Sequence, residues 1–163
     1  MMFDPTAFDN VKVVLEGALY EADLEGSIAV INRQDLVDLA RMSREYRITF
    51  QLSHVKGVNV ELTLSSTLSM LSSELLMLSN QQSGANLKLT YRIDEKTELG
   101  AKLERILKRC WGNRLFEKIE YRSSESGKKL FYKHVFNRPI LEDQVDDLIA
   151  LSEKSIQSLE MLI

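Results

Sequence analysis

The stretch 86–111 changes its hydrophobic period once, and this change limits the possible folds more than any other feature. In residues 86–93 apolar and polar residues alternate, which predicts a half-buried strand. In residues 95–111 apolar residues recur every three or four positions, which predicts an amphipathic helix. Asp94 can cap the start of that helix, and Gly112 can end it. A strand followed directly by a helix, each with one apolar side, predicts two layers around a shared core.

Two further pairs of segments predict β-hairpins. Residues 46–52 and 58–64 alternate in the same way on either side of a turn at 54–57. Residues 115–123 and 129–136 flank a loop at 124–128 that is rich in Ser, Glu and Gly. A short strand is also expected at 27–31. Because hairpins join antiparallel strands, these segments predict a mostly antiparallel sheet.

Helical periodicity predicts four helices besides the one at 95–111. Asp4 and Pro5 form a helix start, and apolar residues then repeat to position 22. A strand through Val11 and Val13 is the alternative there, because Val is a poor helix former. Asn32 and Asp35 resemble a capping box before a helix at 33–44. The remaining two helices are expected at 66–80, rich in Ser and Leu, and from Pro139 to the end of the sequence.

These elements predict a single α+β domain over residues 1–163, built as a two-layer sandwich with the helices on one face of the sheet. The N-terminal helix occupies 5–22, and two half-units follow at 28–80 and 86–163, separated by a linker-like segment at 81–85. Both half-units have the predicted order β-α-β-β-α. This order allows a pseudo-twofold repeat, although no residue identities support one.

Composition is that of a globular protein with 163 residues, 44% of them hydrophobic and 28% charged. No apolar run reaches the roughly 18 residues that cross a bilayer, and no secretory leader is recognisable at the N-terminus. We therefore expect a cytoplasmic protein that does not enter membranes. Cys110 is the single cysteine, which excludes an intramolecular disulfide. Structural zinc needs about four ligands, and only His54 and His134 could join Cys110, so no zinc site is expected. No cofactor motif is present, and no metal site is expected.

Charge is distributed unevenly along the chain, whose net charge is −3. Residues 1–40 and 139–163 are acidic, whereas residues 86–138 carry fourteen Lys or Arg against seven Asp or Glu. This basic region can dock the acidic ends of the chain, or it can bind single-stranded nucleic acid with the help of Phe131. Candidate contacts to phosphate lie on or just after the helix at 95–111: Lys102, Arg105, Lys108, Arg109 and Arg114. Further basic residues expected to share an open sheet face are Lys88, Arg92, Lys118, Arg122, Lys129 and Lys133.

Catalytic signals are weak. His134 lies between Tyr132 and Phe136 on a predicted strand and could act as a general base, but no nucleophile or acid lies near it in the sequence. Acidic pairs four residues apart, Glu142 with Asp146 and Asp143 with Asp147, fit the start of a helix better than a metal site. We therefore assign no catalytic residues, and an enzyme that uses His134 is the least favoured alternative.

The predicted last helix carries an apolar seam to the end of the sequence, at a spacing that either a dimer or the chain's own core can use. Five of the last eight residues are apolar, where a solitary helix end would be polar. The sequence therefore predicts a non-catalytic binding protein that forms a homodimer through this helix. Candidate dimer contacts are Ile156, Leu159, Leu162 and Ile163.

Overall fold

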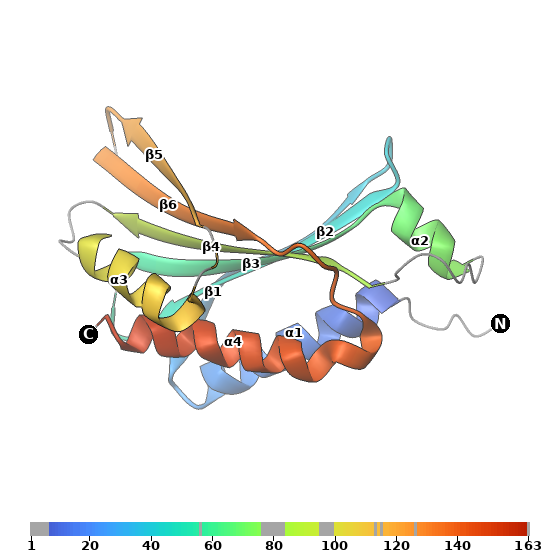
Figure 1. Cartoon of the computed structure of the whole chain (residues 1–163), viewed down its shortest axis with the longest axis horizontal. Helices are drawn as coiled ribbons and strands as arrows, with labels where there is room; N and C mark the ends of the chain where they lie inside the picture. Colours follow the sequence, from blue (N-terminus) through green and yellow to red (C-terminus); the bar gives the residue numbers. More distant parts are fainter. Residues whose placement is uncertain are drawn as a thin grey trace.

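The computed structural model describes residues 7–55, 57–75, 84–94, 100–112, 114, 116–125 and 127–162. Within these residues an antiparallel sheet is covered by helices, as Figure 1 shows. The α+β two-layer prediction is confirmed. In chain order the elements are α1 (Ala7–Leu24), β1 (Ile28–Asp38), β2 (Ser43–Leu52), β3 (Val58–Ser66), α2 (Leu68–Leu75), β4 (Asn86–Asp94), α3 (Gly100–Trp111), β5 (Glu117–Ser123), β6 (Gly127–Val135), η1 (Glu142–Gln144) and α4 (Val145–Glu160).

The six strands of the sheet lie in the order β1-β2-β3-β4-β6-β5, and every neighbouring pair is antiparallel. The predicted hairpins correspond to β2–β3 and β5–β6, which confirms both. The second hairpin joins the sheet through β6, so that β4 pairs with a strand that follows it by more than thirty residues. As a result β1 and β5 form the two edges of the sheet.

The core lies between the sheet and a layer formed by α1, α3 and α4, which Figure 1 shows below the strands. Apolar residues at every second position of β2, β3 and β4 point into this core, as the alternation predicts. α1 packs against both the sheet and α4, and α4 also contacts α3. Sheet residues that are fully buried in this layer include Tyr46, Ile48, Phe50, Leu62, Leu89 and Tyr91.

Most predicted helices are present where the structure describes the chain. α1 confirms the first helix and extends two residues further than predicted. In α3, Leu103, Ile106 and Leu107 are buried as the periodicity predicts, and Gly112 ends the helix with a positive φ of 61°. Asp94 is the last residue of β4, and the predicted first turn of the following helix, 95–99, lies outside the described residues. The same holds for residues 5–6 and for the second half of the helix predicted at 66–80.

The helix predicted at 33–44 is wrong. This segment continues β1 to Asp38, turns, and begins β2 at Ser43. The Asp38 side chain accepts hydrogen bonds from the backbone N–H groups of Ala40 and Arg41, which stabilises the turn, and Met42 completes it with φ of 54°. Because the first half-unit lacks this helix, the predicted β-α-β-β-α order does not occur in it, and the pseudo-twofold repeat is not confirmed.

Gly84 allows two distant segments to approach closely. Its φ is 144°, and a Cβ atom built at this position would lie 2.0 Å from the carbonyl oxygen of Ile140. Beside it, Ala85 and Ile140 exchange backbone hydrogen bonds of 3.0 and 2.7 Å. This bridge fastens the entry to β4 to the segment that leads into α4.

The face of the sheet opposite the helices is polar. At its centre the Glu61 carboxylate is paired with the Arg92 guanidinium at 2.8 Å, and Thr49 and Thr63 contact the same carboxylate. Lys88 lies on this face too, where burial and the nearby charge of Lys133 hold its pKa below the ordinary value. The charged side chains on this face are therefore in contact with one another and with the solvent. The face needs no layer of helices to bury it.

Candidate functional site

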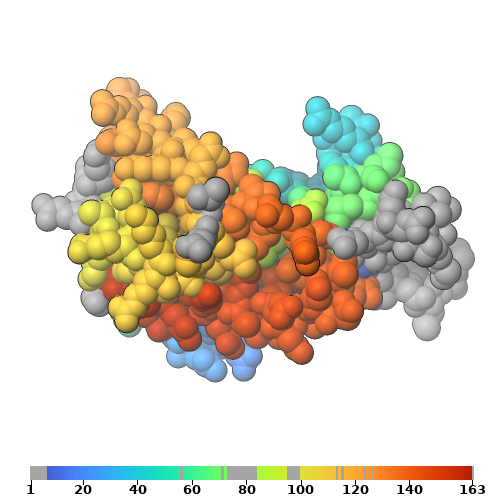
Figure 2. Space-filling model, viewed as in Figure 1, coloured from blue at the N-terminus to red at the C-terminus, as the bar shows by residue number. Residues whose placement is uncertain are grey.

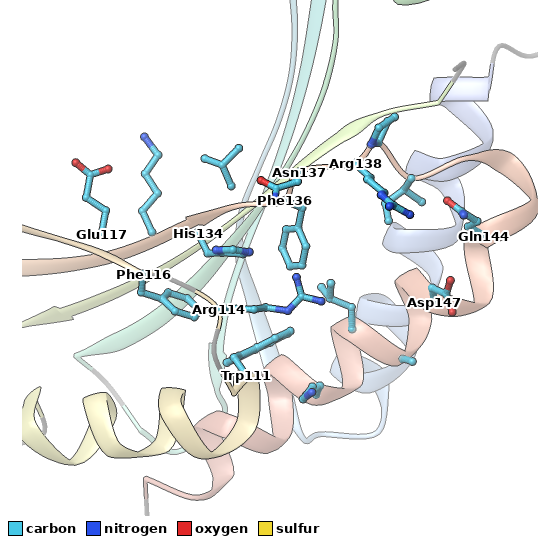
Figure 3. Close-up of a pocket in the computed structure, with 17 residues that line it drawn as sticks. Trp111, Arg114, Phe116, Glu117, His134, Phe136, Asn137, Arg138, Gln144 and Asp147 are labelled. Atoms are coloured by element: carbon cyan, nitrogen blue, oxygen red, sulfur yellow. The ribbon is translucent and has the colours of Figure 1, made fainter. Parts of the chain in front are cut away.

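A pocket of about 1250 Å³ lies at the place where β5 begins beside β6. One wall is the connection from α3 to β5, the second is the end of β6 and the segment after it, and the third is the outer side of α4. Figure 3 shows these three parts around the labelled side chains. Because β5 starts at Glu117, opposite Lys133, the last residues of β6 pair with β4 on one side but have no described strand on the other. This gap in the sheet opens the pocket.

Four rings form a continuous aromatic wall. The ring centroids of Trp111 and Phe136 are 6.4 Å apart, those of Phe136 and His134 are 4.7 Å apart, and those of His134 and Phe116 are 5.4 Å apart. His134 of β6 and Phe136, which follows its last residue, project to the same side, because they are two positions apart on an extended chain. The wall therefore depends on strand alternation in β6 and on the end of α3, which brings Trp111 to it.

Cations lie directly on this wall. The Arg114 guanidinium carbon is 4.8 Å from the centroid of Phe136, and the Lys154 Nζ atom is 5.0 Å from that of Trp111. Both distances fall within the range of cation–π attraction. In Figure 3 the Arg114 side chain reaches toward Phe136 from the α3–β5 connection.

Basic residues outnumber acidic ones around the pocket. The basic lining residues are Arg114, Arg138, Lys154 and Lys133, of which Lys133 lies at the rim and projects to the open face of the sheet, and the acidic ones are Glu117 and Asp147. Among the residues that the structure describes, none of the four cations forms an ion pair. Some Arg and Lys side chains elsewhere are paired with carboxylates, such as Lys12, Arg44 and Arg47. The pocket therefore offers hydrogen-bond donors and positive charge to an anion.

A buried chain of hydrogen bonds holds Trp111 in the wall. Its indole N–H donates to the hydroxyl of Tyr91 at 3.0 Å, and that hydroxyl lies 2.6 Å from the Ser158 Oγ atom. Ser158 in turn donates to the carbonyl of Ser155, so Tyr91 must donate to Ser158. Burial raises the pKa of Tyr91 to about 12, which keeps its proton in place at neutral pH.

The predicted nucleic-acid contacts differ in their surroundings. Arg105, Lys108 and Arg109 are exposed on α3, whereas Arg114 lies in the pocket. Lys102 donates a hydrogen bond of 3.1 Å to the carbonyl of Leu162, beyond the end of α4.

The sheet separates these residues from the other basic side chains. Lys88, Arg92 and Lys133 lie on the open face together with Lys129 and Phe131, as expected. The expectation was wrong for Lys118 and Arg122. Lys118 and Arg122 are four positions apart on β5, so both side chains point to the same face of the sheet. This is the helix side, because the Lys118 Nζ atom lies 3.3 Å from the Glu104 carboxylate of α3. The basic region thus divides between the two sides of the molecule.

Ion pairs give no support to docking of the acidic helices onto the basic region. In the described part of the chain the acidic residues of α1 pair with β1 and β2, through Glu16 to Arg33 and Asp9 to Arg44. Within 86–138, the ion pairs between described residues are Lys118 with Glu104 and Lys128 with Glu120, and Arg92 pairs with Glu61.

The predicted dimer contacts have different surroundings. Leu159 and Leu162 are buried in the chain's own core, and Ile156 is half-buried against it. Ile163 lies outside the described residues. Among the described residues of the seam, the chain's own core covers Leu148, Leu159 and Leu162, whereas Leu141, Val145 and Ile156 are only half-buried.

Other chemistry finds little support in the geometry. His134 belongs to the aromatic wall, and the acidic residues Glu142, Asp143 and Asp146 are exposed at the start of α4. In the described ranges no three His, Cys, Asp or Glu residues gather closely enough to hold a metal ion. Across those same ranges, no helix combines the length and apolar character that a membrane span requires.

No protein-family model, curated protein or solved structure matches this chain. The pocket must therefore be interpreted from its own chemistry. Sequence reasoning singled out Arg114 and His134 but assigned them to different hypotheses, and it missed Trp111, Phe136 and Lys154 as parts of one site. The alternation of Tyr132, His134 and Phe136 was the available signal for an aromatic surface.

Proposed function

We propose that the protein is a binding protein without chemistry of its own, and that its pocket holds a small organic anion with a flat apolar body. The supporting observation is the position of Arg114, whose guanidinium lies over the Phe136 ring in the pocket without a carboxylate partner among the described residues. An Arg whose guanidinium carbon lies over a ring still has N–H donors at its rim, which a carboxylate, sulfonate or phosphate can accept.

The aromatic wall suits the apolar part of such a ligand. Trp111 and Phe136 meet edge to face, and flat rings pack against such surfaces in offset or edge-on arrangements. Small-molecule sites have volumes of about 300–1000 Å³, are mostly apolar, and contain a few placed polar groups. This pocket is somewhat larger and more open, so we expect micromolar rather than nanomolar binding.

The test uses two probes that differ only in the anionic group. 8-Anilinonaphthalene-1-sulfonate has a flat apolar body and a sulfonate, and N-phenyl-1-naphthylamine has the same body without it. Trp111 is the only tryptophan of the chain and lines the pocket, so its fluorescence should change as a probe binds. We expect the sulfonate to bind at least about tenfold more tightly, which corresponds to roughly 1.4 kcal/mol.

Two variants distinguish binding at this site from nonspecific binding of the probe to the protein. Arg114→Gln should weaken binding of the sulfonate by about tenfold and leave the neutral probe unchanged. Arg109→Gln is the matched control, because Arg109 is exposed on α3 and is not part of the pocket. Equal affinities for the two probes, or equal effects of the two variants, would contradict the proposal.

The other predicted functions stay predictions. Single-stranded nucleic acid would have to use either α3 or the open sheet face, and its affinity should then fall steeply with salt. Replacing Arg105 and Arg109 together should weaken the salt dependence of this affinity if α3 is the binding surface. An enzyme that employs His134 would require a substrate bound in the same pocket. Cytoplasmic location is expected from the sequence and can be tested by fractionation.

Self-association through the last helix can be tested by removing the residues after Ser155. If Ile156 and its neighbours contact a second subunit, the shortened chain should be a monomer with most of its stability. Because Leu159 and Leu162 are buried in the chain's own core, we expect instead that the shortened chain has a lower melting temperature and the same oligomeric state as the full chain. Sedimentation and thermal melts on both forms distinguish these outcomes.

A further inference from the structure

The hairpin formed by β1 and β2 projects from the body of the molecule, as Figures 1 and 2 show at its cyan tip. From Ile31 to Asp38 every residue of β1 is exposed. Exposed apolar side chains gather on this hairpin, although water is an unfavourable surrounding for them. They are Ile31, Leu36, Val37, Leu39 and Met42, of which Leu39 is 80% exposed.

The outer edge of β1 is open. β1 pairs with β2 on one side only, and no other strand of the described residues lies on its second side. Such an edge presents unpaired N–H and C=O groups, which readily accept another strand. A bulge between Val30 and Asn32 interrupts the strand, so a regular ladder can form only from Asn32 onward.

We propose that β1 pairs with β1 of a second copy of this chain, antiparallel about a twofold axis at Gln34. The two six-stranded sheets then form one continuous sheet. This inference is independent of the proposed ligand site, because the pocket lies at the β5 edge and β1 is the opposite edge.

Charge complementarity selects the second copy and the register. With the axis at Gln34, Arg33 lies opposite Asp35 of the partner subunit, and the same pair repeats on the other side of the axis. Opposite charges on directly facing strand residues stabilise a sheet, whereas like charges destabilise it. An axis at Arg33 or at Asp35 would set that residue against its own copy, so the charges disfavour both of these neighbouring registers.

The same register covers the exposed apolar residues. Val37 comes just after the regular ladder, on the face that also carries Arg33, and lies next to the bulge at Ile31 of the partner subunit. The tip of the hairpin, with Leu39, extends alongside the start of the partner's β1. Leu24 ends α1 just before that start and is 89% exposed in the single chain. The register therefore brings Leu39 to the strand that follows α1 in the partner subunit, four residues after the exposed Leu24 begins the connection to it.

Neighbouring side chains hold the charged pair in position. Lys12 and Arg44 donate hydrogen bonds of 2.7 and 3.0 Å to the Asp35 Oδ2 atom. Arg33 donates to the Tyr20 hydroxyl at 2.7 Å and lies 5.7 Å from the centroid of its ring. Both side chains are therefore ordered before a second copy arrives, which lowers the entropic cost of association.

A cysteine at the axis tests the register directly. In Gln34→Cys the two introduced thiols should face each other at the Cα separation of about 4.5–5.5 Å that opposed antiparallel residues have, which a disulfide can bridge. Mild oxidation should therefore yield a covalent dimer. Glu117→Cys, on the opposite edge strand β5, is the matched control and should stay monomeric on a denaturing gel, as should the unaltered protein with its half-buried Cys110.

Sedimentation of the full chain tests the charge pair. The unaltered protein should be a dimer at tens of micromolar, and Arg33→Asp should weaken the dimer by at least about tenfold. Leu36→Lys provides a second variant, because a lysine on an edge strand opposes pairing without touching Arg33 or Asp35. Circular dichroism confirms that each variant is folded. A monomeric unaltered protein, or a dimer that neither variant weakens and that Gln34→Cys does not cross-link, would overturn the inference.

Discussion

Trp111 donates its indole hydrogen to the hydroxyl of Tyr91 across 3.0 Å, which joins the end of α3 to the middle of β4. These two residues belong to the strand and helix whose change of period is the clearest signal in the sequence. Tyr91 is fully buried, and Trp111 is nearly so. The bond therefore fixes the helix to the sheet and places the indole ring in the wall of the pocket.

Removal of this acceptor should be costly. In Tyr91→Phe the Trp111 N–H stays buried without a partner, so we expect a loss of about 1–3 kcal/mol in the free energy of unfolding. Urea melts give the value. Tyr121→Phe removes a hydroxyl from an exposed residue of β5, and its effect should stay within about 0.5 kcal/mol. Equal losses in the two variants would show that the buried hydrogen bond contributes nothing special.

The buried face of α3 can be tested by truncation of its side chains. Leu103→Ala or Ile106→Ala should each lower stability by roughly 2–5 kcal/mol, because both positions are in the core and a cavity would remain. Arg105→Ala lies between them on the exposed side and should cost much less. Denaturant unfolding that gives similar small losses for all three would contradict the orientation of the helix.

Two glycines should respond in opposite directions to the same substitution. Gly84→Ala forces a Cβ atom against the Ile140 carbonyl at a positive φ, so we expect a loss of more than about 2 kcal/mol. Gly17→Ala places the methyl group in open space on α1 and should stabilise the protein by about 0.5–1 kcal/mol. Thermal melts compare them, and the prediction fails if Gly84→Ala melts at or above the unaltered protein.

Acid should weaken the hold of β1 on its neighbours. Partial burial opposes ionisation of Asp35, but hydrogen bonds and charges from Arg44 and Lys12 outweigh it and hold its pKa below the ordinary value. The stability that Asp35 contributes is therefore complete above the ordinary pKa of about 3.9 and is lost as the pH falls through the lower folded-state value. Asp35→Asn should lose less stability than the unaltered protein below about pH 4.

The pH dependence of unfolding in urea gives this comparison. Asp143→Asn, at an exposed position of η1, is the control and should follow the unaltered protein. A steeper acid loss in Asp35→Asn than in the unaltered protein would reverse the assigned sign.

Most of the fold could be predicted from the sequence because its elements have one apolar side. The alternation in β4 and the helical spacing in α3 record burial on one face, which a local pattern can show. The prediction for the segment after Asn32 was wrong because this segment has no buried side. β1 leaves the core after its first residues, so its exposed part shows no alternation, and Leu36, Val37 and Leu39 resembled a helical stripe. Pairing with β2, which is tertiary information, decided the outcome.

The pocket was less predictable than the fold. Arg114, His134 and Lys154 come from three separate elements, and only the packing of α4 against the end of α3 places them together. The count of charges along the chain also gave a wrong expectation, because it treated as one basic region side chains that lie on opposite faces of the sheet. Alternation within β4 and β5 carried the information about faces, but the choice of face for β5 required its register with β6.

The packing of α1 against α4 has a consequence for the timing of synthesis. Val145 follows Leu24 by about 120 residues, so a ribosome that adds 5–20 residues per second finishes α1 on the order of ten seconds before α4 begins. During that interval the apolar side of α1 has no helix beside it, and the sheet lacks part of its cover. A chaperone that binds exposed apolar helices during translation would have its longest opportunity on α1, and slower translation should lengthen it.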